Sequence, residues 1–477
     1  MSKASTKPPS GMRDFLPADV ARRTHVIEVV RRIYGRYGFA PLETPTIENL
    51  STLLGKYGDE GDQLLYRILH RRDALARALE KGAEVKELDL ADQGLRYDLT
   101  VPLARVVAGY DLPRFFKRYQ IQPVWRADRP GRGRFREFYQ CDVDITGTTS
   151  LAAEAEVCAA VAEVLQALGF DDFVIKVNHR ELLRAMIRAA GVDEKLEGSA
   201  LVAIDKLDKI GQDGVRAELA ERGITAESAN TLLELVLIGE RDGGVTNLAG
   251  EPMAAAPRAG LVDLQTRLQA DERGAAALGA VDQLLTLCAH TPAAKHLRFA
   301  PDLARGLSYY TGAIFEIAVA DLPSSLGGGG RYDGLVGMFG KKEIPAVGFS
   351  LGLERILVVM EERGMFPSDL GVGPELLLCW LDVDLADVLA VAARLRAQGL
   401  RVEVYPEAAK LGRQLGYGDS PGVKAPVAGI LGKDELRHGM ITLKHLQSGA
   451  QVRLRTEEAA AQIAEWRGDG EDPESAD

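Results

Sequence analysis

The sequence predicts an α+β protein: an antiparallel sheet with helices, a helical segment inserted into it, and a smaller α/β unit after it. Residues 116–147 show the alternation typical of paired strands. Residues 170–296 are rich in Ala, Leu, Glu and Arg and repeat helical patterns. After residue 374, strand-like and helix-like runs follow one another in turn.

The first unit, residues 11–169, is expected to mix helices with antiparallel strands. An apolar stripe predicts a helix over residues 19–37, which Gly38 stops. A second helix follows Ser150, which can cap its first turn, and Gly169 ends it. The stripe of this second helix is typical of packing in a core or at a dimer interface.

The most informative strand covers residues 139–145. Apolar and polar residues alternate there, so three polar side chains share one face: Gln140, Asp142 and Asp144. The turn before it is basic, since residues 114–136 hold eight basic residues and one acid in a chain of net charge −11. This local inversion of charge suits a polyphosphate or a nucleic-acid end. Alone, the pattern also suits an ordinary hairpin with a solvated face and a mobile basic turn.

Two more segments argue against an ordinary hairpin. Residues 96–101 repeat the alternation and are expected to place three polar residues on one strand face: Arg96, Asp98 and Thr100. Residues 344–357 are expected to run from a glycine-rich turn into a helix that ends at Glu354 and Arg355. The chain thus carries several polar segments that could converge on one site.

The order and spacing of these segments resemble the three motifs of the class II aminoacyl-tRNA synthetases. Pro45, within residues 38–48, matches the first motif. The hairpin with Arg126 matches the second, and the helix with Arg355 matches the third. The resemblance implies an antiparallel-sheet catalytic domain of that class.

The signature segments resemble those of the histidyl-tRNA synthetases. Residues 303–317 (LARGLSYYTGAIFEI) and 327–334 (GGGGRYDG) match most specifically. Residues 11–17 and 410–419 are further close matches. One departure is Ser308, which stands where the family more often has an acid.

This resemblance implies a histidine–tRNA ligase that uses ATP with Mg²⁺ as a substrate and holds no permanent cofactor. Arg126 is expected at the α-phosphate, Arg355 at the γ-phosphate and Arg305 near the α-phosphate, so that Arg305 and Arg126 assist the chemical step. Each guanidinium can make two parallel charge-assisted bonds to phosphate, which lysine cannot copy.

The resemblance also assigns the histidine pocket. The residues expected to grip the amino group are Asp98, Thr100 and Gln140. The residues expected to read the imidazole ring are Asp144 and Tyr310, with Tyr309 as a further histidine-binding residue. A pocket that requires such hydrogen bonds rejects ligands lacking them by about 10⁴-fold or more.

The predicted domains are a disordered N-terminus and four structured or partly structured parts. The catalytic domain covers residues 11–169 and 297–366, and the helical insertion 170–296. The α/β unit, residues 374–456, resembles the anticodon-binding domain of class II synthetases. Residues 1–10 form the disordered start, and residues 457–477 a helix and an acidic tail. By the resemblance, the insertion lies over the active site and can approach the tRNA acceptor stem.

Composition limits the possible partners. The acidic balance argues against nonspecific nucleic-acid binding, so tRNA(His) must be met on local basic surfaces. Four scattered cysteines and seven scattered histidines predict no metal site. No membrane segment or signal peptide is visible, which predicts a cytoplasmic protein. The resemblance implies pairing through the first-motif region, and the apolar, strand-forming residues 38–48 would be an aggregation hazard if left bare, so a homodimer is expected.

Two alternatives remain open from the sequence. The first is a synthetase-like regulatory subunit of ATP phosphoribosyltransferase, which binds histidine. Such proteins typically lack the C-terminal domain and lose motif residues, whereas this chain keeps both. The second is another class II synthetase, for prolyl, threonyl or glycyl transfer, against which residues 303–317 discriminate.

Overall fold

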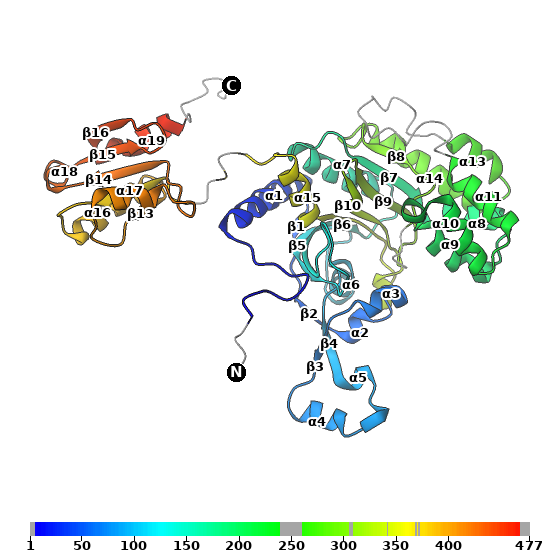
Figure 1. Ribbon diagram of the computed structural model, residues 1–477. Coiled ribbons are helices and arrows are strands. Elements are labelled where there is room, and N and C mark those ends of the chain that lie inside the picture. Colours follow the sequence, from blue (N-terminus) through cyan, green and yellow to red (C-terminus); the bar gives the residue numbers. More distant parts are fainter. Residues whose placement is uncertain are drawn as a thin grey trace. The chain divides into compact units, whose positions relative to one another are not determined.

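The computed structural model describes residues 5–238, 260–304, 309–340, 342–367, 370 and 373–467. The chain divides into two compact units, Met1–Pro367 and Ser368–Asp477. Within the described residues, no helix combines the length and the apolar character needed to cross a bilayer. Figure 1 shows the helices and strands of both units.

The first unit is built on an eight-stranded sheet. Its strands lie in the order β1 (Ala40–Pro41), β5 (Phe116–Trp125), β6 (Glu137–Thr146), β11 (Ala346–Gly352), β10 (Leu322–Arg331), β9 (Ala313–Val319), β7 (Val174–His179) and β8 (Leu297–Phe299). All neighbours from β5 to β7 are antiparallel, and only the two edge pairs are parallel. The predicted antiparallel sheet is therefore confirmed.

The helices that pack against this sheet include α1 (Pro17–Arg36), α7 (Ala152–Ala167) and α15 (Leu353–Glu362). The predicted apolar stripe of α1 is buried, with Val26, Val30 and Ile33 inaccessible to solvent. Eleven of the sixteen residues of α7 are buried. Burying apolar surface stabilises the fold by about 25 cal/mol per Å².

The helical insertion begins later than predicted. Residues 174–179 fall inside the predicted 170–296 span, yet they form β7, which pairs with β9 and β8 in the main sheet. A strand of six residues shows too few apolar–polar alternations to be distinguished from the strong helical patterns beside it. The described helices that follow are α8 (Arg180–Ala189), α9 (Glu197–Ile204), α10 (Leu207–Glu221), α11 (Ala226–Val236), α13 (Leu261–Arg267) and α14 (Glu272–Cys288), which gather at one end of the sheet in Figure 1.

The strand predicted over residues 96–101 is wrong. β4 (Ala91–Leu95) ends before it, and α6 (Thr100–Gly109) begins within it. The carboxylate of Asp98 accepts a hydrogen bond from the Val101 N–H at 3.0 Å, which favours a helix start over a strand. Pro102 in the first helical turn needs no N–H partner and suits the same start.

β4 belongs instead to a small antiparallel sheet with β2 (Ile47–Asn49) and β3 (Arg67–Leu69). In Figure 1 these strands lead away from the large sheet toward α4 and α5. The short helices here are α2 (Leu50–Leu53), α3 (Gly58–Gln63), α4 (Asp73–Leu79) and α5 (Glu87–Leu90).

The second unit contains a five-stranded sheet in the order β13 (Val402–Val404), β12 (Leu376–Trp380), β14 (Val427–Leu431), β15 (Met440–His445) and β16 (Gln451–Arg455). Its helices are α16 (Leu385–Ala397), α17 (Leu411–Gly418), α18 (Lys433–His438) and α19 (Ala459–Arg467). The predicted parallel character holds for β13, β12 and β14 only. β15 and β16 are antiparallel, because short connections reverse the chain where a parallel pair needs a long crossover.

Candidate functional site

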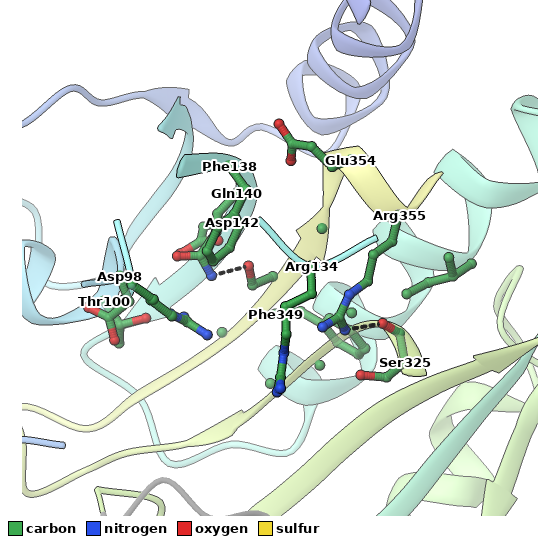
Figure 2. Close-up of a pocket in the computed structure, with 18 of the residues that line it drawn as sticks. Asp98, Thr100, Arg134, Phe138, Gln140, Asp142, Ser325, Phe349, Glu354 and Arg355 are labelled. Carbon is green, nitrogen blue, oxygen red and sulfur yellow. Dashed lines mark hydrogen bonds between the residues drawn. The ribbon is translucent and has the colours of Figure 1, made fainter. Parts of the chain in front are cut away.

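A cavity opens between β6, β10 and β11, and residues of the basic turn and of the α6 start complete its wall. Its polar lining includes Asp98, Thr100, Arg126, Arg134, Gln140, Asp142, Asp144, Tyr309, Tyr310, Ser350, Glu354 and Arg355. Figure 2 shows Asp98 and Thr100 on one side of the space, and Arg134 and Arg355 on the other. The cavity therefore has a carboxylate end and a guanidinium end.

The strand face predicted from alternation lines this cavity. Gln140, Asp142 and Asp144 lie on β6 and are at most 9% exposed. Across the ladder they face Gly352, Ser350 and Gly348, whose small size leaves room for the longer polar groups. A Cβ at Gly348 would lie only 1.9 Å from Asp144 Oδ1, so a glycine is required there.

Arg118 is a site residue that sequence reasoning did not assign. It was counted in the basic turn, but it lies on β5, opposite Asp144, and is inaccessible to solvent. Its Nη2 is 2.9 Å from Asp144 Oδ2 and 3.8 Å from Asp142 Oδ2. Burial raises the pKa of both carboxyls, and Arg118 opposes that rise. Its strand register opposite Asp144, which the sequence pattern does not contain, shows this role.

Asp144 has a second partner that fixes its orientation. The Tyr332 hydroxyl donates to Asp144 Oδ1 at 2.5 Å, and Tyr332 itself is buried. Tyr332 belongs to the 327–334 signature, but no role was predicted for it. Tyr332 thus holds one oxygen of the carboxylate, and Arg118 contacts the other.

At the α6 start, Asp98 is held by two tyrosines. Its carboxylate accepts from the Tyr57 hydroxyl and from the Tyr309 hydroxyl, each at 3.2 Å. Burial raises the pKa of Asp98, although the Val101 N–H and the charge of Arg126 oppose the shift. Tyr309 thus lines the cavity and also holds Asp98, while Tyr310 lines it from the next position.

Two predicted arginines line the cavity. Arg126 donates from Nε to the Tyr97 carbonyl at 3.1 Å, and its guanidinium lies 4.2 Å from the Tyr97 ring centre and 5.1 Å from that of Phe138. Arg355 donates from Nη1 to the Ser325 carbonyl at 2.5 Å (Figure 2). These contacts fix both guanidinium groups before any ligand arrives.

The helix prediction around Arg355 needs a correction. Residues 346–352 form the strand β11, and Glu354 and Arg355 stand in the first turn of α15, not at its end. The glycines in this segment suggested a turn, but they face side chains of β6 across the ladder. The positive end of the helix dipole thus lies beside the cavity.

The basic turn does not form one cationic patch. Arg132 pairs with Glu362, and Arg136 donates to the Asp128 and Ser10 carbonyls. Of the eight basic residues in 114–136, Arg126 and Arg134 are those that line the cavity. Arg134 was not assigned a role from the sequence.

The glycines of β10 serve the sheet as well as the cavity. Gly327, Gly328 and Gly329 line the cavity. A Cβ at Gly327 would also lie 2.4 Å from the Ser350 carbonyl oxygen, and one at Gly329 2.0 Å from that of Gly348. The close approach of β11 alone therefore demands glycine at both positions.

Two predicted features lie outside the described residues: Arg305 and the unusual Ser308. Within the described part of the chain, no group of three or more His, Cys, Asp or Glu side chains is arranged to hold a metal ion. Glu354 is a single buried carboxyl at the cavity wall. Burial raises its pKa to about 7, and the Tyr139 N–H bonds to it at 2.9 Å.

An antiparallel sheet that carries a basic hairpin turn with a fixed arginine and a strand-to-helix segment with a second arginine is the arrangement of a class II aminoacyl-tRNA synthetase. The segments matched to its second and third motifs meet here on one cavity.

The comparisons identify the family. A family profile described as histidyl-tRNA synthetase matches residues 11–356, and an anticodon binding domain profile matches residues 384–466. The chain is 41% identical over 464 residues to a histidine–tRNA ligase of Cytophaga hutchinsonii, covering 95% of this chain and 98% of the relative. A Gloeobacter violaceus histidine–tRNA ligase is 40% identical over 479 residues, covering 95% and 97%. The chain belongs to the histidyl-tRNA synthetase family, and the predicted ligase class is confirmed.

Solved structures agree with this fold. A histidyl-tRNA synthetase from a Nostoc species superposes with a TM-score of 0.75 at 28% identity, covering 97% of this chain and 100% of that one. An ATP phosphoribosyltransferase regulatory subunit/histidyl-tRNA synthetase from Bacillus halodurans reaches 0.69 at 21% identity, covering 91% and 99%. At 21% identity, the similarity to the Bacillus halodurans structure shows the fold alone.

Proposed function

We propose that the cavity joins L-histidine to ATP, forming histidyl-adenylate and pyrophosphate, and then transfers the histidyl group to the 3′ ribose of tRNA(His). The observation that carries the proposal is the division of the cavity. Buried carboxylates of β6 and the α6 start suit a cationic, hydrogen-bonding amino acid, and Arg126 and Arg355 suit a polyphosphate.

In the first step, the histidine carboxylate attacks the α-phosphorus of ATP and pyrophosphate leaves. Charge moves onto phosphate oxygens, so preorganised cations lower the barrier. Arg126 takes the α-phosphate and Arg355 the γ-phosphate, each already fixed by a backbone carbonyl. Mg²⁺ arrives with ATP and is held mainly by the phosphates. Arg305 adds a further cation near the α-phosphate by family resemblance.

In the pocket, Asp98, Thr100 and Gln140 bind the ammonium. Asp144 and Tyr310 bind the ring, and Tyr309 orients Asp98 through its hydroxyl. Because Tyr332 and Arg118 hold Asp144, its carboxylate is ready to accept a ring N–H without reorganising.

The second unit is assigned to the anticodon arm of tRNA(His), and a homodimer in the cytoplasm is the proposed assembly and location. The anticodon binding domain match supports the first assignment. Sedimentation at micromolar concentration tests the dimer, which a monomer would contradict. Cell fractionation tests the location.

The direct test of the function is charging of tRNA(His) by the purified chain with ATP and histidine. Charging is expected, and it separates an enzyme from a histidine-binding regulatory subunit. A protein that binds histidine but charges no tRNA would favour the regulatory alternative.

A further inference from the structure

β6 presents three buried acceptor atoms at the cavity that have no hydrogen-bond partner within the described part of the chain: Gln140 Oε1, Asp142 Oδ1 and Asp144 Oδ2. Asp144 Oδ2 is ion-paired with Arg118 Nη2 at 2.9 Å, which leaves Gln140 Oε1 and Asp142 Oδ1 as the two acceptors to be explained. A buried polar atom without a partner costs free energy, so such atoms in a binding cavity indicate donors that arrive with a ligand. The roles given above use Gln140 but not Asp142.

The charge of Asp142 is also balanced incompletely. Arg118 Nη2 lies 3.8 Å from Asp142 Oδ2, beyond hydrogen-bond distance, while it contacts Asp144 at 2.9 Å. One guanidinium therefore serves two buried carboxylates. Burial raises the pKa of Asp142 to about 7; Arg118 and the Ser350 hydroxyl oppose the shift, and the charges of Asp144 and Asp98 add to it. A ligand cation would complete the balance.

The chemistry of histidine indicates which of its groups supplies that cation. The ammonium carries a full charge and three N–H donors, whereas a neutral imidazole offers one N–H. At the ring position, both oxygens of Asp144 already contact protein groups, Tyr332 at 2.5 Å and Arg118 at 2.9 Å. The unsatisfied acceptors, on Gln140 and Asp142, match the ammonium.

We propose that Asp142 is a further substrate-binding residue whose Oδ1 accepts a hydrogen bond from the α-ammonium of histidine, beside Gln140. The inference rests on the proposed function, because it takes histidine as the ligand of this cavity. Figure 2 shows the two side chains next to each other, with Asp98 and Thr100 on the neighbouring wall. The ammonium would thus meet carboxylates from two elements, β6 and the α6 start.

The test compares the isosteric variants Asp142→Asn and Asp144→Asn with two ligands. Histidinol keeps the ammonium and the ring, and imidazolepropionate keeps the ring and the carboxylate but lacks the ammonium. Inhibition constants are measured by competition in histidine-dependent ATP–pyrophosphate exchange by the full chain. Asp142→Asn is expected to weaken histidinol about tenfold or more, the scale of one charged hydrogen bond, and to leave imidazolepropionate unchanged or tighter. Asp144→Asn is expected to weaken both.

Three outcomes would overturn the inference. Unchanged histidinol inhibition of Asp142→Asn would mean that Asp142 does not bind the ammonium. Equal weakening of both ligands, or a raised KM for ATP, would mean that Asp142 only supports the fold. If the asparagine variant is unstable, Asp142→Ser also removes the charge with a smaller side chain and is tested with the same two ligands. A wild-type chain without histidine-dependent exchange would instead refute the proposed function itself.

Discussion

Gly348 is the position at which one added methyl group should damage the histidine pocket most. A Cβ there would lie 1.9 Å from Oδ1 and 2.6 Å from Cγ of Asp144, far inside contact distance. Asp144 cannot move without lengthening its bonds to Tyr332 and Arg118, which are 2.5 and 2.9 Å long. Gly348→Ala therefore displaces the carboxylate proposed to read the ring.

The size of the effect follows from those contacts. Overpacking a well-packed site costs about 1–3 kcal/mol of stability, and breaking a buried ion pair costs about 3 kcal/mol or more. Losing a charged hydrogen bond to the substrate costs about 1.5–3 kcal/mol of binding free energy, which weakens histidine affinity by about 10–100-fold. The KM for ATP is expected to change by less than about twofold, because Arg355, the proposed γ-phosphate ligand, lies on the other side of the cavity (Figure 2).

The assay is ATP–pyrophosphate exchange, with histidine and ATP titrated separately, beside a urea unfolding curve. Gly334→Ala is the matched control, since a Cβ at that exposed glycine of the 327–334 segment would meet no atom within 4 Å. The control should keep both KM values and the unfolding midpoint. A Gly348→Ala variant with the wild-type KM for histidine would refute the placement of Asp144 in the pocket.

The remaining predictions address other parts of the site. Arg355→Lys should raise the KM for ATP about tenfold with little change for histidine, because lysine cannot make the two parallel bonds; equal changes in the two constants would count against the assignment. Arg305→Ala should slow single-turnover adenylation by about 10²-fold or more, and an unchanged rate would remove its role. Burial raises the pKa of Glu354 from 4.5 to about 7, so the folded protein holds this proton more tightly and stability is lost as pH rises between those values. Glu354→Gln should accordingly gain about 2 kcal/mol relative to wild type between pH 5 and pH 8 in urea unfolding, and a pH-independent difference would contradict this. Ending the chain at Gly373 should preserve exchange and weaken tRNA charging, increasingly so at higher salt, and full charging would remove the tRNA role of the second unit.

Alternation along β6 was sufficient to predict which polar residues share a face, because side chains of a strand alternate regardless of its partners. It therefore brought Gln140 and Asp144 to the cavity correctly. The same pattern failed at residues 96–101, where the carboxylate of Asp98 bonds to the backbone of Val101 and starts a helix. A local hydrogen bond from a side chain to the backbone competes with strand formation, and the alternation of apolar and polar residues does not reveal it.

Partners across the sheet were harder to predict. Arg118 appeared to belong to a basic turn, and only its register opposite Asp144 shows it to be a buried counter-ion. The role of Gly348 also depends on the strand across the ladder, which lies about two hundred residues away in sequence. Such pairings are set by tertiary structure, which composition and local pattern do not contain.

The measurement closest to the central claim is ATP–pyrophosphate exchange by the wild-type chain with each proteinogenic amino acid in turn. Three buried acids, Asp98, Asp142 and Asp144, surround the proposed amino-acid end of the cavity. Exchange is expected with L-histidine and with no other amino acid to a comparable extent, because a site built for ring hydrogen bonds rejects ligands without them. Equal turnover with proline, threonine or glycine would contradict the account.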